Sequence, residues 1–129
     1  MKKTIICVDD EKSLLWGLQQ QIKRAFSDRF LIELAESGEE ALEILAELKQ
    51  SDAKAFLLIT DEMMPGMKGH QLIENVNKDY PEMKCILLSG YAAEEVLTPS
   101  FTAKVFKFIK KPWDYDELID AIKAASDSP

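Results

Sequence analysis

Leu57-Leu58-Ile59-Thr60-Asp61-Glu62-Met63-Met64-Pro65-Gly66 is the stretch of sequence that decides the fold. Its apolar first half ends on a carboxylate, Asp61, and a Pro-Gly turn follows soon after. A buried strand does not continue through Asp-Glu and then Pro-Gly, so the strand ends at Asp61. In open α/β sheets, ligands bind beyond the carboxyl ends of the strands. We therefore predict that Asp61 faces the edge of the sheet where ligands bind and chemistry takes place.

The rest of the chain alternates apolar runs with amphipathic segments. Continuous apolar runs are typical of parallel strands that are buried on both faces. We predict five strands, at Thr4–Val8, Phe30–Ala35, Ala55–Thr60, Lys84–Ser89 and Val105–Ile109. We predict helices from about Glu11 to Ala25, from Ser37, after Gly66 and from Asp114, and a short helix at Ala92–Leu97. The predicted fold class is α/β: a flavodoxin-like, doubly wound, five-stranded parallel sheet of order 2-1-3-4-5, with helices on both faces.

Two of the predicted helices begin with capping signals. Ser37-Gly38-Glu39-Glu40 is a capping box, in which the Ser37 hydroxyl and the Glu40 carboxylate satisfy free backbone donors. Asp114 followed by Glu117 indicates the start of the last helix in the same way. Prolines mark the ends of two predicted helices. Pro81 ends the third helix, and Pro99 ends the short helix at Ala92–Leu97.

Composition and charge exclude several classes of protein. The 129 residues suit one domain, which we expect to span 1–129 with a core of about 3–126. A net charge of −7 argues against direct contact with nucleic acid. No apolar run approaches the roughly 20 residues that span a bilayer, and the run Ile5–Val8 is too short for a secretory signal. We expect a cytoplasmic protein that does not bind membranes.

The cysteines and the one histidine carry no chemistry that the sequence reveals. Cys7 and Cys85 each lie within an apolar run, so we expect two buried, reduced thiols. Together with the distant His70 they make a poor set of metal ligands. We expect His70 to be exposed at the start of a helix and assign it no role.

Reactive side chains follow four of the five predicted strands. The predicted strand order makes these strand ends neighbours and brings together Asp9, Asp10, Asp61, Ser89 and Lys111. Closely packed carboxylates repel one another and need a counter-charge. Mg²⁺ (or Mn²⁺) fits, because such a hard cation binds through carboxylates and phosphate oxygens. The group suits phosphoryl transfer to Asp61, whose carboxylate would be the nucleophile. The metal and the lysine would neutralise the transferring group, and the Ser89 hydroxyl would donate a hydrogen bond to it.

Four separated blocks of sequence carry these residues. They are Val8-Asp9-Asp10-Glu11, Asp61-Glu62-Met63-Met64-Pro65-Gly66-Met67-Lys68-Gly69, Leu88-Ser89-Gly90-Tyr91 and Lys111-Pro112-Trp113. In this order and spacing, and over essentially the whole chain, they resemble the receiver domain of two-component response regulators. The resemblance implies a phosphorylation-dependent signalling switch. Such a protein assists its own phosphorylation and dephosphorylation but turns over no separate substrate, so we do not expect a conventional enzyme.

The resemblance implies how the phosphoryl group is bound and sensed. Asp61 is the residue that is phosphorylated, Lys111 is the cationic contact, and Ser89 is the switch hydroxyl that moves onto the phosphoryl group. Phe108 takes the rotating aromatic position of the fifth strand, where the family often has tyrosine. Phenylalanine has no hydroxyl, so only inward packing of the ring remains. The bond between Lys111 and Pro112 is expected to be cis.

The resemblance also implies the metal ligands and a slow loss of phosphate. Asp10, Asp61 and the main-chain carbonyl of Met63 would bind Mg²⁺ directly, and Asp9 would bind it through water. Met63 and Tyr91 flank the phosphoryl group and are bulky. We therefore expect them to hinder an attacking water, so that dephosphorylation is slower than in variants with polar residues there.

The partners that the resemblance implies are other proteins. A sensor histidine kinase or a histidine phosphotransfer protein would donate the phosphoryl group. The surface of the fourth helix, fifth strand and last helix would then control a downstream protein or an output domain. The family usually carries an output domain after about residue 125, and we expect none in this chain. Whether the chain is a stand-alone receiver or a fragment, and a monomer or a phosphorylation-dependent dimer, stays open.

Three alternatives belong to other functional classes. A flavodoxin-like FMN-binding electron carrier would need a phosphate-binding loop after the first strand, whereas Asp9-Asp10-Glu11 repels phosphate. A phosphatase with an aspartate nucleophile would need a second acid at Met63. A receiver fold that serves only as a constitutive interaction module remains open, and phosphorylation is the property that distinguishes it.

Overall fold

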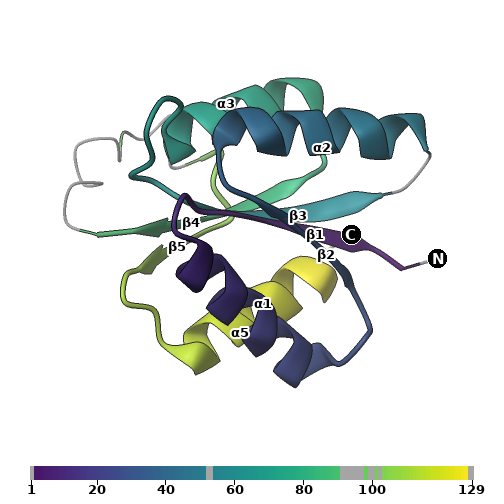
Figure 1. The fold of residues 1–129 in the computed structure, drawn as a ribbon, viewed down its shortest axis with the longest axis vertical. Coiled ribbons are helices and arrows are strands. Elements are labelled where there is room, and N and C mark those ends of the chain that lie inside the picture. Colours follow the sequence, from purple (N-terminus) through teal and green to yellow (C-terminus); the bar gives the residue numbers. More distant parts are fainter. Residues whose placement is uncertain (1, 52–53, 91–97, 99–100, 102, 128–129) are drawn as a thin grey trace.

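One parallel sheet with helices on both faces makes up the structure (Figure 1). The computed structural model describes residues 2–51, 54–90, 98, 101 and 103–127. The strands are β1 (Thr4–Val8), β2 (Leu31–Ala35), β3 (Ala55–Asp61), β4 (Lys84–Ser89) and β5 (Lys107–Lys110). The helices are α1 (Lys12–Phe26), α2 (Gly38–Gln50), α3 (Gly69–Asp79) and α5 (Tyr115–Asp127). All neighbouring strands pair in parallel in the order β2-β1-β3-β4-β5, which confirms the predicted topology.

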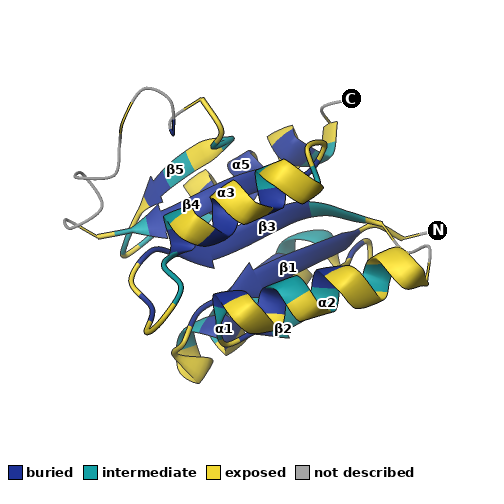
Figure 2. Cartoon of the chain, turned by 90° about the horizontal axis from the view of Figure 1, so that it is seen from above, coloured by how far each residue is buried: buried dark blue, intermediate teal, exposed yellow. Residues whose placement is uncertain are grey.

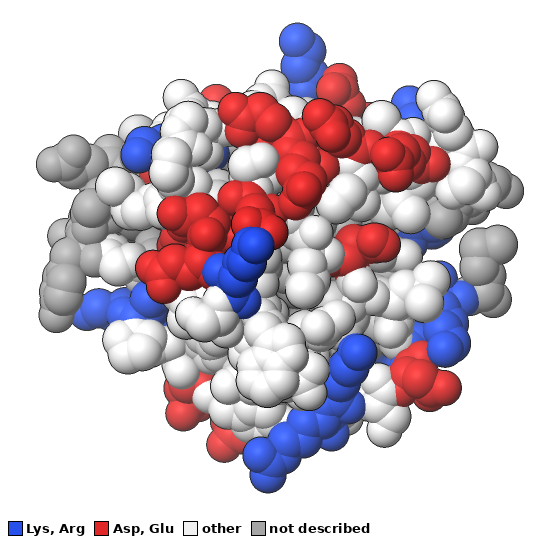
Figure 3. Space-filling model, viewed as in Figure 1, with Lys and Arg blue, Asp and Glu red and all other residues white. Residues whose placement is uncertain are grey.

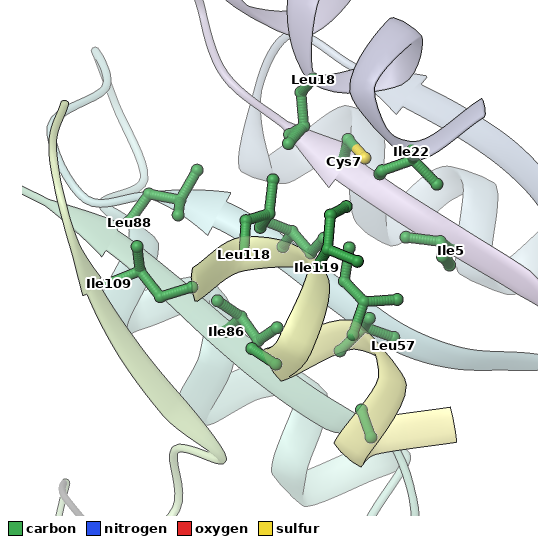
Figure 4. Close-up of a cluster of buried hydrophobic side chains, with 14 of the residues drawn as sticks. Ile5, Cys7, Leu18, Ile22, Leu57, Ile86, Leu88, Ile109, Leu118 and Ile119 are labelled. Carbon is green, nitrogen blue, oxygen red and sulfur yellow. The ribbon is translucent and has the colours of Figure 1, made fainter. Parts of the chain in front are cut away.

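The alternation of side chains along the strands divides the core into two layers. Ile5 and Cys7 of β1 point toward α1 and α5, whereas Ile6 and Val8 pack with α2 and α3. Figure 4 shows the first layer, in which Leu118 and Ile119 of α5 pack over the sheet. All five residues of β1 are buried, and Figure 2 shows the same for most of the sheet. Burial on both faces explains why these strands are continuously apolar rather than alternating.

Side-chain caps begin two helices as the sequence predicts. The backbone N–H of Glu40 donates to the Ser37 hydroxyl at 3.0 Å, which caps α2. The Glu40 carboxylate accepts from the N–H of Glu36 at 2.7 Å, one residue earlier than in the usual capping box. At α5 the N–H of Glu117 donates to the Asp114 carboxylate at 3.0 Å. These bonds hold the strand-to-helix connections in place.

The edge strand β5 is shorter at its start than the apolar run predicts. Pairing with β4 begins at Ile86–Lys107 and ends at Ser89–Lys110. Val105 and Phe106 precede the strand and pack against the two core layers instead. An apolar run therefore marks buried residues but does not separate a strand from the loop that leads into it. The predicted short helix at Ala92–Leu97 lies outside the described residues.

The two cysteines are free and buried, as predicted. Burial raises the pKa of both the Cys7 and Cys85 thiols to about 12. Among the helices that the structure describes, none is long and apolar enough to cross a membrane.

Candidate functional site

The carboxyl ends of β1, β3, β4 and β5 meet at one edge of the sheet. Val8 lies beside Thr60, so the acids that follow β1 lie next to Asp61 at the end of β3. Asp61 in turn pairs with Leu88, and Ser89 pairs with Lys110. The parallel register therefore brings the predicted reactive residues to one place, as the strand order requires.

Lys111 is the cation of this site. Its Nζ lies 3.1 Å from Oδ1 of Asp61 and 3.5 Å from Oδ2 of Asp9. The backbone N–H of Lys111 donates a hydrogen bond of 2.7 Å to the carbonyl of Ser89, which holds the residue at the end of β4. The bond between Lys111 and Pro112 is cis, as predicted. One ammonium group thus serves two buried carboxylates.

Three carboxylates form the acidic part of the site. One oxygen each of Asp9, Asp10 and Asp61 lies within 4.8 Å of the others. Asp9 and Asp61 are buried and Asp10 is exposed, so the group opens to solvent on one side. The Asp9 carboxylate also accepts a hydrogen bond of 3.0 Å from the N–H of Glu11. Acidic side chains also gather over α2, in the upper part of the face that Figure 3 shows.

The charges shift the proton affinities of Asp61 and Lys111. Burial raises the pKa of the Asp61 carboxyl, and the negative charge of Asp9 adds to this rise, although the hydrogen bond and charge of Lys111 oppose it. Burial alone would lower the pKa of Lys111, but the hydrogen bonds and charges of Asp61 and Asp9 outweigh burial and raise it. The lysine therefore stays charged, and the acids hold more negative charge than it can balance.

This donor set fits a hard divalent cation. Carboxylate and carbonyl oxygens are the ligands that Mg²⁺ prefers, and the site holds three carboxylates against one ammonium. A divalent cation would neutralise the remaining negative charge. The solvent-exposed side at Asp10 leaves access for water and for a phosphoryl group.

The structure places three of the remaining predicted residues on β4, on β5 and in the loop after β3. Ser89 is half-buried at the end of β4, and Phe108 is half-buried on β5 with its ring 6.1 Å from that of Phe101 in an edge-to-face arrangement. In the loop after β3, Met63 is 51% exposed, whereas Met64 is buried. Tyr91 lies outside the described residues.

The sequence prediction missed a pair next to the site. Glu62 is buried, and its carboxylate lies 2.6 Å from Nδ1 of His70. The expectation that His70 is exposed was wrong, because only a quarter of its side chain (25%) is accessible. His70 does lie at the start of a helix, as expected. The one signal in the sequence was a second acid at a strand end, with a histidine across a short loop from it.

Comparison with known protein families gives a match over nearly the whole chain. The model of the response regulator receiver domain matches residues 5–123. Proteins of this family are signalling modules rather than conventional enzymes. The match favours a signalling protein over the flavin-binding electron carrier that the sequence left open.

Curated relatives share this region within longer chains. The chain is 30% identical over 123 residues to the hydrogenase transcriptional regulatory protein HoxA of Cupriavidus necator, covering 95% of this chain and 24% of that protein. It is 31% identical over 121 residues to the sensor kinase CckA of Brucella abortus, covering 93% of this chain and 12% of that protein. The DNA-binding transcriptional regulator NtrC of Escherichia coli K12 is 28% identical, with 92% and 24% covered. The chain thus spans about a quarter or less of these relatives.

Solved structures share the whole fold. A two-component transcriptional regulator AraC from Clostridium phytofermentans superimposes with a TM-score of 0.83 at 32% identity, covering 97% of this chain and 93% of that one. The response regulator TrrA of Thermotoga maritima, solved in complex with Mg²⁺ and BeF, superimposes with a TM-score of 0.76 at 28% identity. That comparison covers 97% of this chain and 99% of TrrA.

Proposed function

This chain belongs to the response regulator receiver domain family of two-component signalling, and we propose that Asp61 is the residue on which it accepts a phosphoryl group. The observation that carries the proposal is the contact of 3.1 Å between the Asp61 carboxylate and Lys111, beside two further carboxylates. A buried nucleophile, a fixed cation and an acidic pocket for a metal are the parts that phosphoryl transfer requires.

The reaction follows from these positions. A carboxylate oxygen of Asp61 attacks the phosphorus of a phosphohistidine on the donor. The new P–O bond gives an acyl phosphate, and the P–N bond breaks, leaving its electron pair on the imidazole. Lys111 neutralises part of the charge that spreads over the phosphoryl oxygens. Bound Mg²⁺ would supply the remaining positive charge, with Asp10, Asp61 and the Met63 carbonyl as direct ligands and Asp9 acting through water.

Phosphorylation would then change the surface near Ser89 and Phe108. The Ser89 hydroxyl is the candidate donor of a hydrogen bond to the phosphoryl group, and Phe108 is the candidate aromatic switch. Phe108 already contacts the buried ring of Phe101, so it has an apolar surface to pack against. The equilibrium between the two states would shift only by the difference in their interaction with the phosphoryl group.

The proposed partners are proteins on both sides of this switch. A sensor histidine kinase or a histidine phosphotransfer protein is the proposed donor. A downstream protein or an attached output domain is the proposed recipient, because the relatives carry the matching region within longer chains. The net charge of −7 supports a partner that is a protein rather than nucleic acid.

A direct experiment tests the phosphoacceptor. The protein is incubated with Mg²⁺ and acetyl phosphate, and its intact mass is measured. We expect the mass of one phosphoryl group on the wild type and on Asp120→Asn, an exposed control on α5, but none on Asp61→Asn. An adduct that persists on Asp61→Asn would overturn the assignment. No adduct on the wild type would instead favour the constitutive interaction module.

A further inference from the structure

Glu62 is a buried carboxylate that the proposed phosphoryl transfer does not use. It lies directly after Asp61 and is only 3% exposed. A charged group is costly to bury unless hydrogen bonds replace its lost hydration. The structure supplies them from one residue: Oε1 accepts from the backbone N–H of His70 at 2.7 Å, and Oε2 lies 2.6 Å from the ring Nδ1 of the same residue.

The backbone of Glu62 is held as firmly as its side chain. Its N–H donates to the carbonyl of Leu88 in β4 at 3.1 Å, and its carbonyl accepts from the N–H of Gly69 at 3.0 Å. Gly69 packs so closely here that a Cβ on it would overlap the carbonyl oxygen of Asp61. The end of β3 and the first turn of α3 are therefore joined by three hydrogen bonds, two to the carboxylate and one to the carbonyl.

These bonds close the loop that contains Met63. The loop leaves β3 at Glu62 and returns to α3 at Gly69 and His70, so both of its ends meet at the Glu62 carboxylate and carbonyl. Inside the loop, Met64 is buried and its carbonyl accepts from the Lys68 ammonium at 3.3 Å. Met63 lies between the anchored Glu62 and the anchored Met64. The anchors on both sides therefore restrict the backbone that carries the Met63 carbonyl.

A buried ring also packs against His70. The imidazole lies 6.0 Å from the ring of Phe101, with the two planes at 83° in an edge-to-face contact. Phe101 is itself only 4% exposed, so it offers a fixed surface. The imidazole therefore contacts both the Phe101 ring and the Glu62 carboxylate.

We infer that Glu62 and His70 are positioning residues, which hold the Met63 carbonyl where the metal of the phosphoryl-transfer site needs it. The inference rests on the proposed Mg²⁺ site. Groups that orient metal ligands without touching the metal typically change its affinity by about 10–100-fold when they are removed. An anchored loop has its carbonyl in place before the metal binds, whereas a loosened loop must be ordered by the metal.

The test compares variants that keep or remove the bonds without changing the volume much. Glu62→Leu fills the space but accepts no hydrogen bond. Glu62→Gln retains an acceptor for the His70 N–H and a second polar atom toward Nδ1, so it is the conservative rescue. His70→Phe keeps the edge-to-face contact and the backbone N–H but removes Nδ1. Glu74→Gln, an exposed change on the same helix, is the matched control.

The measurement is the dissociation constant for Mg²⁺, obtained by calorimetric titration of the unphosphorylated protein. We expect an increase of about tenfold for Glu62→Leu, a smaller increase for His70→Phe, and no change for Glu62→Gln or Glu74→Gln. The rate of phosphorylation by acetyl phosphate should fall at low Mg²⁺ and recover at saturating Mg²⁺. Amide exchange between Met63 and Lys68 should become faster in Glu62→Leu without metal.

The outcomes separate this inference from the proposed function. If the wild type binds Mg²⁺ and is phosphorylated, but Glu62→Leu and His70→Phe bind Mg²⁺ as tightly as the wild type, then the positioning role is wrong. If these variants lose thermal stability but bind Mg²⁺ with unchanged affinity, Glu62 and His70 stabilise the fold and do not position the metal ligand. If Glu62→Leu does not fold, His70→Phe decides alone. A wild type that binds Mg²⁺ but takes no phosphoryl group would overturn the proposed function while leaving the positioning role supported by the affinities.

Discussion

Lys111 reaches Asp61 across the end of β4, a strand that contains neither residue. Lys111 directly follows β5, Asp61 is the last residue of β3, and β4 lies between these strands in the sheet. The lysine N–H is bonded to the Ser89 carbonyl at the end of β4, and its Nζ extends to Asp61 Oδ1 at 3.1 Å. The contact is made by the end of the lysine side chain, so it depends on the residue type as well as on the fold.

Replacing Lys111 should slow phosphorylation much more than it weakens folding. In Lys111→Ala the transferring group loses its fixed cation, and removal of one such group typically costs about 10²-fold in rate. The initial rate of adduct formation with acetyl phosphate at saturating Mg²⁺ measures the effect. Lys110→Ala, a change at the exposed neighbouring lysine, serves as the control and should leave the rate unchanged. Equal rates for wild type and Lys111→Ala would show that the contact with Asp61 plays no part in transfer.

Asp61→Asn should stabilise the metal-free protein at neutral pH. Because burial raises the pKa of Asp61 in the folded state, the folded protein binds the proton more tightly than the unfolded chain does. The free energy of unfolding therefore falls as pH rises from the ordinary aspartate pKa through the raised one, and the full penalty applies above it. Asparagine carries no such penalty, and Lys111 keeps Asp9 as a partner at 3.5 Å.

Urea unfolding in the presence of EDTA measures this stabilisation. We expect Asp61→Asn to gain on the order of 1 kcal/mol at pH 7, and the gain should shrink as the pH falls toward the pKa of aspartate in an unfolded chain. A gain that grows on acidification would contradict the sign of the pKa shift.

Gly69→Ala should destabilise the protein, whereas Gly17→Ala should not. A Cβ at Gly69 would overlap the carbonyl oxygen of Asp61 and approach Cα of Glu62 to 2.9 Å, and both atoms belong to the backbone. Overpacking of this kind costs about 1–3 kcal/mol. Nothing lies within 4 Å of a Cβ at Gly17 inside α1, so alanine there should add about 0.5–1 kcal/mol through its helix propensity. Urea unfolding of the two variants distinguishes crowding from propensity, and similar effects at both positions would count against the close approach.

Met63 should lengthen the lifetime of the phosphorylated state. Met63 lies two residues after Asp61 and is 51% exposed, and we expect its side chain to obstruct a water that approaches the phosphoryl group. We expect Met63→Asn to lose phosphate severalfold faster than the wild type, and Met63→Asn with Tyr91→Glu to lose it faster still. The decay of the adduct mass after removal of acetyl phosphate gives both rates. Met67→Asn, a change farther along the same loop, is the control, and unchanged decay in the double variant would exclude the shielding role.

Much of the fold and most of the candidate site followed from local patterns in the sequence. Continuous apolar runs identified strands that are buried on both faces, and the reactive residues were recognised by their places at the strand ends. The parallel order 2-1-3-4-5 then brought these ends together, because parallel strands present their carboxyl ends at one edge. The predicted start of β5 at Val105 was wrong, because Val105 and Phe106 pack against the core layers without joining the strand.

The tertiary structure alone decided which charged groups contact one another. The sequence by itself determined that Asp9, Asp61 and Lys111 share an edge, but only the folded chain pairs one ammonium with both acids, because that pairing depends on distances across the sheet. Glu62 and His70 show the same limit more strongly. Their residue types marked neither of them as a partner of the other, and only the return of the loop to the base of α3 buries the carboxylate against the imidazole.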